Sequence, residues 1–252
     1  MLRKTSLLAA VCTAAVLAVA PGTPAQATTN CTAFGTITLG KYYLNNNLWG
    51  QSSGSGSQCI SDTRTGSTIG WNTTYNWANN PSQVKSYDSS VLGWHWGWKT
   101  SGTELPVRLN AGRDIFTDVR YRVSASGTFN VAYDLWLHDI PNPDWPNNPT
   151  DEVMIWTYRA GGAGPLGTFQ GTVNLAGTSW DLYRGNIGWN VFSFIRRSNT
   201  TAATLHLQDF LGNLVSRGWM ANTKYLSSIE HGTEVFVANG RLDVDSYTAD
   251  IR

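Results

Sequence analysis

The stretch TFNVAYDLWL, residues 128–137, alternates large apolar side chains with smaller or polar ones. A period of two places successive side chains on opposite faces and is typical of a β-strand with one face in a core. Asp134 and Trp136 fall on the same face, so a carboxylate lies beside a large apolar ring. A carboxylate in such surroundings is costly to desolvate and needs a partner or a function.

Short runs of the same kind recur along the chain, separated by turn signals rich in Gly, Asn and Pro. Many short strands at this spacing favour a sandwich or a barrel over alternating strands and helices. Residues 204–219 differ, because their apolar positions follow the helical period. We therefore expect an all-β domain with one helix. The other predicted strands are residues 107–109, 118–123, 153–158, 171–175, 191–196, 234–237 and 241–250, and the turn signals include Asn79-Asn80-Pro81 and Asn239-Gly240.

The N-terminus has the features of a secretory signal peptide. Arg3 and Lys4 precede an apolar stretch at residues 7–20, and Ala25-Gln26-Ala27 provides a small-x-small cleavage site. The alternative is a membrane anchor, but the apolar run is shorter than the roughly 20 residues that span a bilayer. We expect a signal peptide at residues 1–27, a secreted extracellular domain at residues 28–252, and no membrane association after cleavage.

Charge and cysteine content limit the partners. The chain has 18 Lys and Arg and 17 Asp and Glu, and removal of Arg3 and Lys4 with the leader changes the formal charge from +1 to −1. Without a basic excess, we expect no nucleic-acid partner. Cys12 leaves with the leader, and Cys31 and Cys59 are expected to form a disulfide in an oxidising compartment. No histidine pair has metal-ligand spacing and no Asp/Asn loop resembles a calcium site, so we expect neither a metal nor a cofactor.

Aromatic residues are unusually common, with 12 Trp and 10 Tyr. Indole and phenol faces stack on the apolar C–H surface of sugar rings, which favours a glycan-binding groove. The alternative is a sandwich core, where aromatic side chains also dominate the packing. Trp94, Trp96 and Trp98 are spaced by two and would share one face if they lay on one strand.

Two further carboxylates share the environment of Asp134. Glu152 is in line with Met154 on one predicted strand, and Glu234 begins another. Glycoside hydrolysis needs two such groups, one to attack or to activate water and one to protonate the leaving oxygen. The alternative is that each acid is simply solvated or salt-bridged. Spacing within each strand does not show that Glu152 and Glu234 face each other.

A series of short motifs extends over the chain from residue 30 onward. They are Asn46-Asn47-Leu48-Trp49-Gly50, Asn130-Val131-Ala132-Tyr133-Asp134, Glu152-Val153-Met154-Ile155-Trp156, Gly164-Pro165-Leu166-Gly167, Gly171-Thr172-Val173-Asn174, Ser193-Phe194, Asp209-Phe210 and Gly232-Thr233-Glu234. In sequence and order these motifs resemble glycoside hydrolase family twelve, the small secreted endo-β-1,4-glucanases. The resemblance implies a β-jelly-roll sandwich of two packed antiparallel sheets with a concave substrate groove.

The resemblance also implies roles for individual residues. Glu152 matches the nucleophile of a retaining mechanism, Glu234 the general acid/base, and Asp134 a carboxylate that supports the nucleophile. Met154 matches a residue beside the nucleophile that shapes the substrate site.

Asn47 and Trp49 match a sugar subsite on the non-reducing side, and Trp136 is a further candidate for substrate binding. The segments 91–99 and 140–150 depart from the family pattern, which leaves the preferred glucan open. The resemblance implies a cellulase that acts on β-1,4-glucan, and a monomer is expected. The alternatives are a xyloglucan-specific enzyme with the same machinery and a non-catalytic carbohydrate-binding jelly roll.

Overall fold

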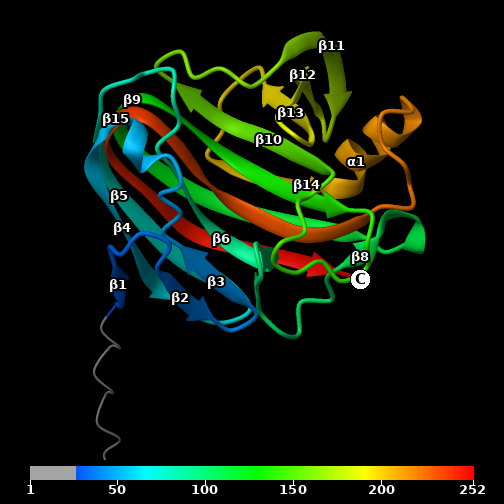
Figure 1. Cartoon of the computed structure of the whole chain (residues 1–252), viewed down its shortest axis with the longest axis horizontal. Helices are drawn as coiled ribbons and strands as arrows, with labels where there is room; N and C mark the ends of the chain where they lie inside the picture. The colour runs from blue at the N-terminus through cyan, green and yellow to red at the C-terminus, as the bar shows by residue number, and fades with distance from the viewer. Residues whose placement is uncertain (1–26) are drawn as a thin grey trace, which may run out of the picture.

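The computed structural model describes residues 27–252, so the predicted leader at residues 1–27 lies outside the described residues except for Ala27. This part of the chain forms 15 strands, one α-helix and two short 3-10 helices (Figure 1), which confirms an all-β fold with one helix. No helix among residues 27–252 is long and apolar enough to cross a membrane.

Two long strands, β9 (Ile115–His138) and β15 (Tyr225–Ile251), pair with each other over most of their length (Figure 1). Each has different outer neighbours in its two halves. Residues 228–235 of β15 pair with β6, whereas residues 238–247 pair with β5. Residues 129–137 of β9 pair with β10, whereas residues 116–120 pair with β14. The two strands therefore join two sheets.

The first sheet, here called the groove sheet, contains the candidate site. Its strands are β2 (Thr36–Leu39), β3 (Tyr42–Asn45), β6 (Ser86–His95), the first half of β15, the second half of β9, β10 (Asp151–Ala160), β13 (Asn190–Arg196), β12 (Thr178–Asn186) and β11 (Thr168–Leu175), with β7 (Trp98–Lys99) beside β6 and β8 (Val107–Arg108) beside β15. The prediction of purely antiparallel sheets needs one correction, because β10 and β13 are parallel. They are connected through β11 and β12, which lets β13 return in the same direction.

The second sheet, here called the outer sheet, lies behind the groove sheet. Its strands are β1 (Thr29–Asn30), β4 (Ser55–Arg64), β5 (Ile69–Ala78), the second half of β15, the first half of β9 and β14 (Ala202–His206). The 3-10 helices η1 (Gln51–Ser53) and η2 (Leu109–Ala111) lie in connections. The predicted disulfide is confirmed, because Cys31 and Cys59 are bonded and tie the segment after β1 to β4.

Successive side chains on the central strands point alternately into the core and toward the groove face. On β9 the odd-numbered side chains, such as Tyr133 and Leu135, belong to the main apolar core between the sheets. Val153 on β10 and Ile229 on β15 belong to the same core. The even-numbered side chains of these strand segments therefore point to the opposite face of the groove sheet.

The helix is shorter than predicted. Residues 204–219 were expected to be helical, but α1 spans only Leu207–Ser216. The residues just before it, Ala202–His206, pair antiparallel with β9 and form an edge strand. Pairing with β9 therefore overrides the local pattern, while Leu207, Phe210 and Leu214 keep the helical period and are buried.

The predicted turn at Asn239-Gly240 is also wrong, because both residues lie inside β15. Gly240 has a φ of 147°. A Cβ atom there would lie 2.4 Å from the Cα of Ala125. Glycine is needed here for the close approach of β9 and β15, so the predicted strands 234–237 and 241–250 are one strand.

The three tryptophans spaced by two do not share a face. Strand β6 ends at His95, and Trp96 adopts a φ of 39° in the turn that leads to β7. Trp94 is buried, whereas Trp98 is 60% exposed. The change of direction at Trp96 separates the two side chains.

Candidate active site

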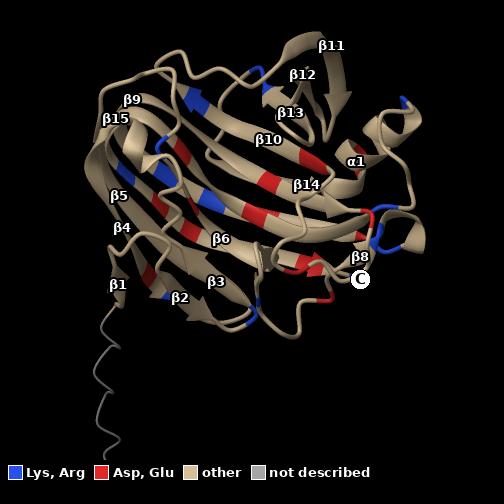
Figure 2. Ribbon diagram, viewed as in Figure 1, with Lys and Arg blue, Asp and Glu red and all other residues tan. Residues whose placement is uncertain are grey.

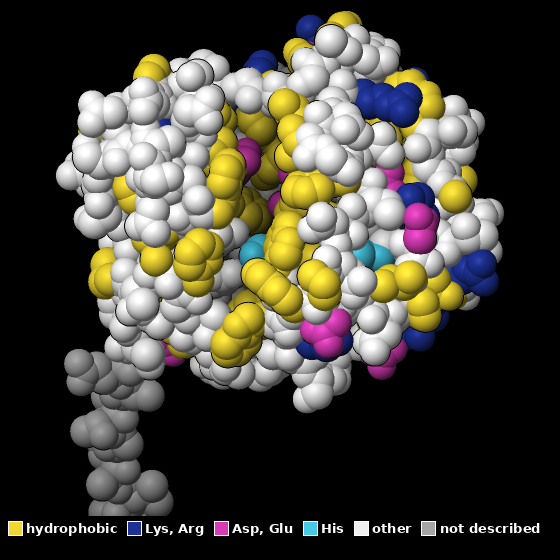
Figure 3. All heavy atoms as spheres, viewed as in Figure 1, with side chains coloured by type: hydrophobic (Ala, Val, Ile, Leu, Met, Phe, Trp, Pro, Cys, Tyr) yellow, Lys and Arg dark blue, Asp and Glu magenta, His cyan; other side chains and the backbone are white. Residues whose placement is uncertain are grey.

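Four acidic side chains gather where β10, β9 and β15 lie side by side: Glu152, Asp134, Glu230 and Glu234. Asp134 on β9 is directly opposite Met154 on β10 and Glu230 on β15. Glu152 is opposite Trp136, one pleat along the same face. Figure 2 shows acidic positions on these neighbouring strands. Figure 3 shows a hollow with hydrophobic side chains along its walls and acidic side chains inside it.

Glu152 is 8% exposed and has one strong hydrogen-bond donor. The indole Nε1 of Trp189, in the turn between β12 and β13, donates to its Oε2 at 2.7 Å. Burial raises the pKa of Glu152, the Trp189 hydrogen bond opposes that rise, and the nearby Glu234 and Glu230 add to it. The indole therefore favours the ionised form of Glu152, which is the form that a nucleophile needs.

Glu234 lies two pleats from Glu230 on the same face of β15 and is held by Asn130. The Nδ2 of Asn130 donates to Oε2 of Glu234 at 2.5 Å, and its Oδ1 accepts the backbone N–H of Glu234 at 3.1 Å. Burial raises the pKa of Glu234 to about 7, against the effect of the Asn130 hydrogen bond. A carboxyl group with this pKa can both give and take a proton near neutral pH.

Asp134 is 3% exposed. Burial raises its pKa well above the ordinary value, and the charges of Glu152, Glu230 and Glu234 raise it further. Neighbouring negative charges disfavour one another, so the protonated form of Asp134 is favoured when the other carboxylates are charged. A protonated Asp134 is a hydrogen-bond donor among acceptors.

Glu230 is a fourth carboxylate that the sequence analysis missed. It is fully buried, and its oxygens accept hydrogen bonds from His95, Trp136 and Ser89. One signal could have found it: it precedes Glu234 by four positions, which places both on one face if the strand is extended toward the N-terminus. The predicted strand began at residue 234 and excluded it.

The predicted substrate-binding residues surround this cluster. Trp49 follows β3 and is 57% exposed, as a stacking platform would be. Asn47, Trp136 and Met154 are only 7%, 6% and 5% exposed. The Nδ2 of Asn47 lies 3.5 Å from Nε2 of His95, a long contact. Their roles in binding sugar stay predictions.

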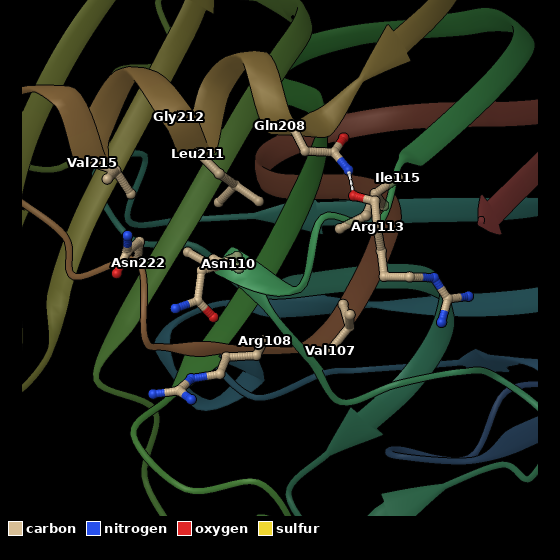
Figure 4. A pocket seen from close by; sticks show the side chains of 11 residues that line it. Val107, Arg108, Asn110, Arg113, Ile115, Gln208, Leu211, Gly212, Val215 and Asn222 are labelled. Atoms are coloured by element: carbon tan, nitrogen blue, oxygen red, sulfur yellow. Dashed lines mark hydrogen bonds between the residues drawn. The ribbon is translucent and has the colours of Figure 1, made fainter.

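A separate cavity of about 200 Å³ lies between α1 and the segment 107–115 (Figure 4). Leu211 and Val215 of α1 line one side, and Gln208 donates to the carbonyl of Arg113 at its edge. No carboxylate lines this cavity, so it lacks the groups that acid–base hydrolysis needs. Among residues 27–252 no cluster of three or more His, Cys, Asp or Glu side chains could hold a metal ion.

Comparison with known proteins identifies the family. Residues 40–252 match the model for glycosyl hydrolase family 12. The chain is 39% identical to endoglucanase S of Pectobacterium parmentieri, over 84% of this chain and 82% of that protein. It is 35% identical to an inactive glycoside hydrolase of Phytophthora nicotianae, over 90% of this chain and 94% of that protein. Its fold matches the native family 12 xyloglucanase from Bacillus licheniformis with a TM-score of 0.83 and 40% identity, covering 89% of this chain and 100% of the other. The chain therefore belongs to glycosyl hydrolase family 12.

Proposed function

We propose that the protein is a secreted, retaining endo-β-1,4-glucanase that hydrolyses internal bonds of cellulose and related β-glucans. The observation that carries the proposal is the set of buried carboxyl groups, Glu152, Glu234 and Asp134, on the groove face. A module that only binds carbohydrate does not need acids with raised pKa values in its groove. The 39% identity to endoglucanase S supports the choice of substrate.

In the proposed reaction, the ionised Glu152 attacks the anomeric carbon while Glu234 transfers its proton to the glycosidic oxygen that leaves. The bond from the anomeric carbon to that oxygen breaks, and a glycosyl ester with Glu152 forms. Glu234, now ionised, takes a proton from water, which attacks the same carbon and releases Glu152. The proposal gives Asp134 the role of supporting Glu152, because a protonated Asp134 can donate a hydrogen bond to the charged nucleophile.

Secretion belongs to the same proposal. A polymer such as cellulose does not enter a cell, so its hydrolase has to act outside. The proposed signal peptide at residues 1–27 provides the export route. The disulfide between Cys31 and Cys59 is consistent with an oxidising compartment.

A second candidate is a xyloglucan-specific endo-β-1,4-glucanase. The observation that favours it is the 40% identity to the Bacillus licheniformis xyloglucanase. The likeness to an inactive relative makes activity itself part of the test. Reducing-sugar release from carboxymethylcellulose, mixed-linkage β-glucan and xyloglucan should be measured in parallel. Highest activity on the first two supports the proposal, activity on xyloglucan alone supports the second candidate, and no release from any of them leaves a binding module.

The stereochemistry gives an independent test. A retaining enzyme first releases the β-anomer, and NMR early in turnover detects it before mutarotation. If the α-anomer appeared first, Glu152 would not be a nucleophile that forms a covalent intermediate. Azide rescue separates the two glutamates: Glu152→Ala should give the α-glycosyl azide and Glu234→Ala the β-anomer, with a substrate that has a good leaving group.

A further inference from the structure

Glu230 has no role in the proposed reaction, and yet several side chains donate hydrogen bonds to its carboxylate. Its Oε1 accepts from Nδ1 of His95 at 2.8 Å and from Nε1 of Trp136 at 3.0 Å, and its Oε2 accepts from Oγ of Ser89 at 2.7 Å. Its side chain is fully buried. A buried carboxylate is costly unless its oxygens are hydrogen-bonded, and these three donors, with a longer contact from Oγ of Ser228 at 3.5 Å, meet that need here.

Through two of these donors, Glu230 is connected to two candidate sugar-binding residues. Trp136 is itself a candidate for substrate binding. His95 connects Glu230 to Asn47, because its Nε2 lies 3.5 Å from Nδ2 of Asn47. Glu230 thus contacts Trp136 directly, and it contacts Asn47 through the ring of His95.

The carboxylate also sets the direction of each hydrogen bond. An ionised carboxylate only accepts, so His95 must carry a proton on Nδ1. In the neutral ring Nε2 is then an acceptor that faces Nδ2 of Asn47, at the long distance of 3.5 Å. One N–H of Asn47 is then directed at His95. The amide oxygen and the second N–H are the groups that Asn47 offers to sugar hydroxyls.

The indole of Trp96 packs against the same two side chains. Its ring centroid lies 4.8 Å from that of His95 and 4.9 Å from that of Trp136, both edge to face. Each of the two rings is therefore held by a hydrogen bond to Glu230 and by packing against Trp96. Loss of Glu230 would release the hydrogen-bonded edges of the two rings and leave their packing in place.

We propose that Glu230 is a positioning residue that orients Asn47, through His95, and Trp136 for binding a β-1,4-linked glucosyl unit. The inference rests on the proposed function, since it concerns the same groove. Glu230 is assigned a positioning role and not a catalytic one because its oxygens are taken up by protein donors. Glu152 and Glu234 have fewer such partners and remain the reacting pair.

The test measures binding without hydrolysis. All proteins carry Glu234→Gln, and calorimetry gives the Kd for cellohexaose. Glu230→Ala should raise the Kd about tenfold, because hydrogen bonds to a charged group are lost on two groove residues. Glu230→Gln should stay within about threefold of the reference protein, since its amide oxygen still accepts from His95 and Trp136.

Asp243 provides a control on the same strand. Its carboxylate lies in the half of β15 that belongs to the outer sheet, and its Oδ1 accepts from Nε of Arg241 at 2.6 Å. Asp243→Ala should leave the Kd unchanged. Equal Kd values for Glu230→Ala and the reference would overturn the proposal, as would equal weakening by Glu230→Gln and Glu230→Ala, or by Asp243→Ala.

Asn47 provides a second readout. If Glu230 acts partly through Asn47, Glu230→Ala should weaken binding less when Asn47→Ala is already present. Full additivity would remove Asn47 from the proposal. Absence of cellohexaose binding by the reference protein would overturn the subsite itself. Absence of hydrolysis by the wild-type protein, with binding retained, would instead overturn only the proposed enzymatic function.

Discussion

Replacement of Trp189 by Phe should change the pH dependence of the reaction. The substitution removes the indole N–H that donates to Glu152 at 2.7 Å. The phenyl ring keeps much of the packing against Trp136, whose ring lies 5.8 Å away. A hydrogen bond to a charged group contributes about 1.5–3 kcal/mol. At 1.36 kcal/mol per pKa unit, its loss should raise the pKa of Glu152 by about one to two units.

The sign of the effect follows from the proposed role of Glu152 as the nucleophile. A nucleophile must be ionised, so a higher pKa requires a higher pH. The acid limb of kcat/KM should therefore move upward by about one to two pH units. At a fixed pH on that limb, kcat/KM should fall by about tenfold for each unit. The profile is measured on a soluble cello-oligosaccharide, with circular dichroism to confirm folding.

Trp180→Phe is the control. Trp180 is also a buried indole, but its Nε1 donates to the carbonyl of Leu175 on the neighbouring strand β11. Its substitution should reduce stability and leave the limb in place. If Trp189→Phe left the acid limb unchanged, or moved it to lower pH, the indole would not stabilise an ionised nucleophile. The assignment of Glu152 would then need revision.

Three further substitutions test other contacts. Asn130→Ala removes the donor that lowers the pKa of Glu234, so the basic limb of kcat/KM should move upward by about one pH unit. An unmoved limb would show that Asn130 does not set the pKa of the proposed acid/base. Trp49→Ala should raise KM roughly fivefold for long cello-oligosaccharides and less for short ones, whereas equal changes would place its ring outside a remote subsite. Replacing both Cys31 and Cys59 by Ser opens a link across 28 positions and should cost about 3–4 kcal/mol of unfolding free energy in urea titrations, with activity at 25 °C retained.

The fold could be predicted where the pattern is local. Residues 128–137 alternate without interruption, and the structure places them in one strand with one face in the core. The continuity of β9 and β15 could not be predicted. Gly127 and Gly240 have the composition of turns, and only the partner strand shows that they serve close backbone approach. A glycine permits either outcome, so the local sequence leaves both open.

The site shows the same division. Glu152, Glu234 and Asp134 could be proposed as site candidates from the sequence, because each alternates with apolar residues and matches a motif of the family that the chain resembles. Trp189 could not. It lies in a turn without periodic pattern, and it reaches Glu152 only because β13 runs parallel to β10, with Val191 opposite Glu152. That pairing depends on the whole connection through β11 and β12.

The central position of β15 has a consequence for how the molecule reaches its folded state. β15 is made after every strand that it pairs with, and it lies between β6 and β9 in one sheet and between β5 and β9 in the other. Asn130 and Glu234 are 104 positions apart. Pairing over such separations slows folding, and before β15 is in place its neighbours expose strand edges that can pair with other chains. During refolding, a chain in which β15 is not yet paired should therefore either aggregate or go on to the active protein. Refolding at low chain concentration should favour the active protein, because aggregation requires a second chain.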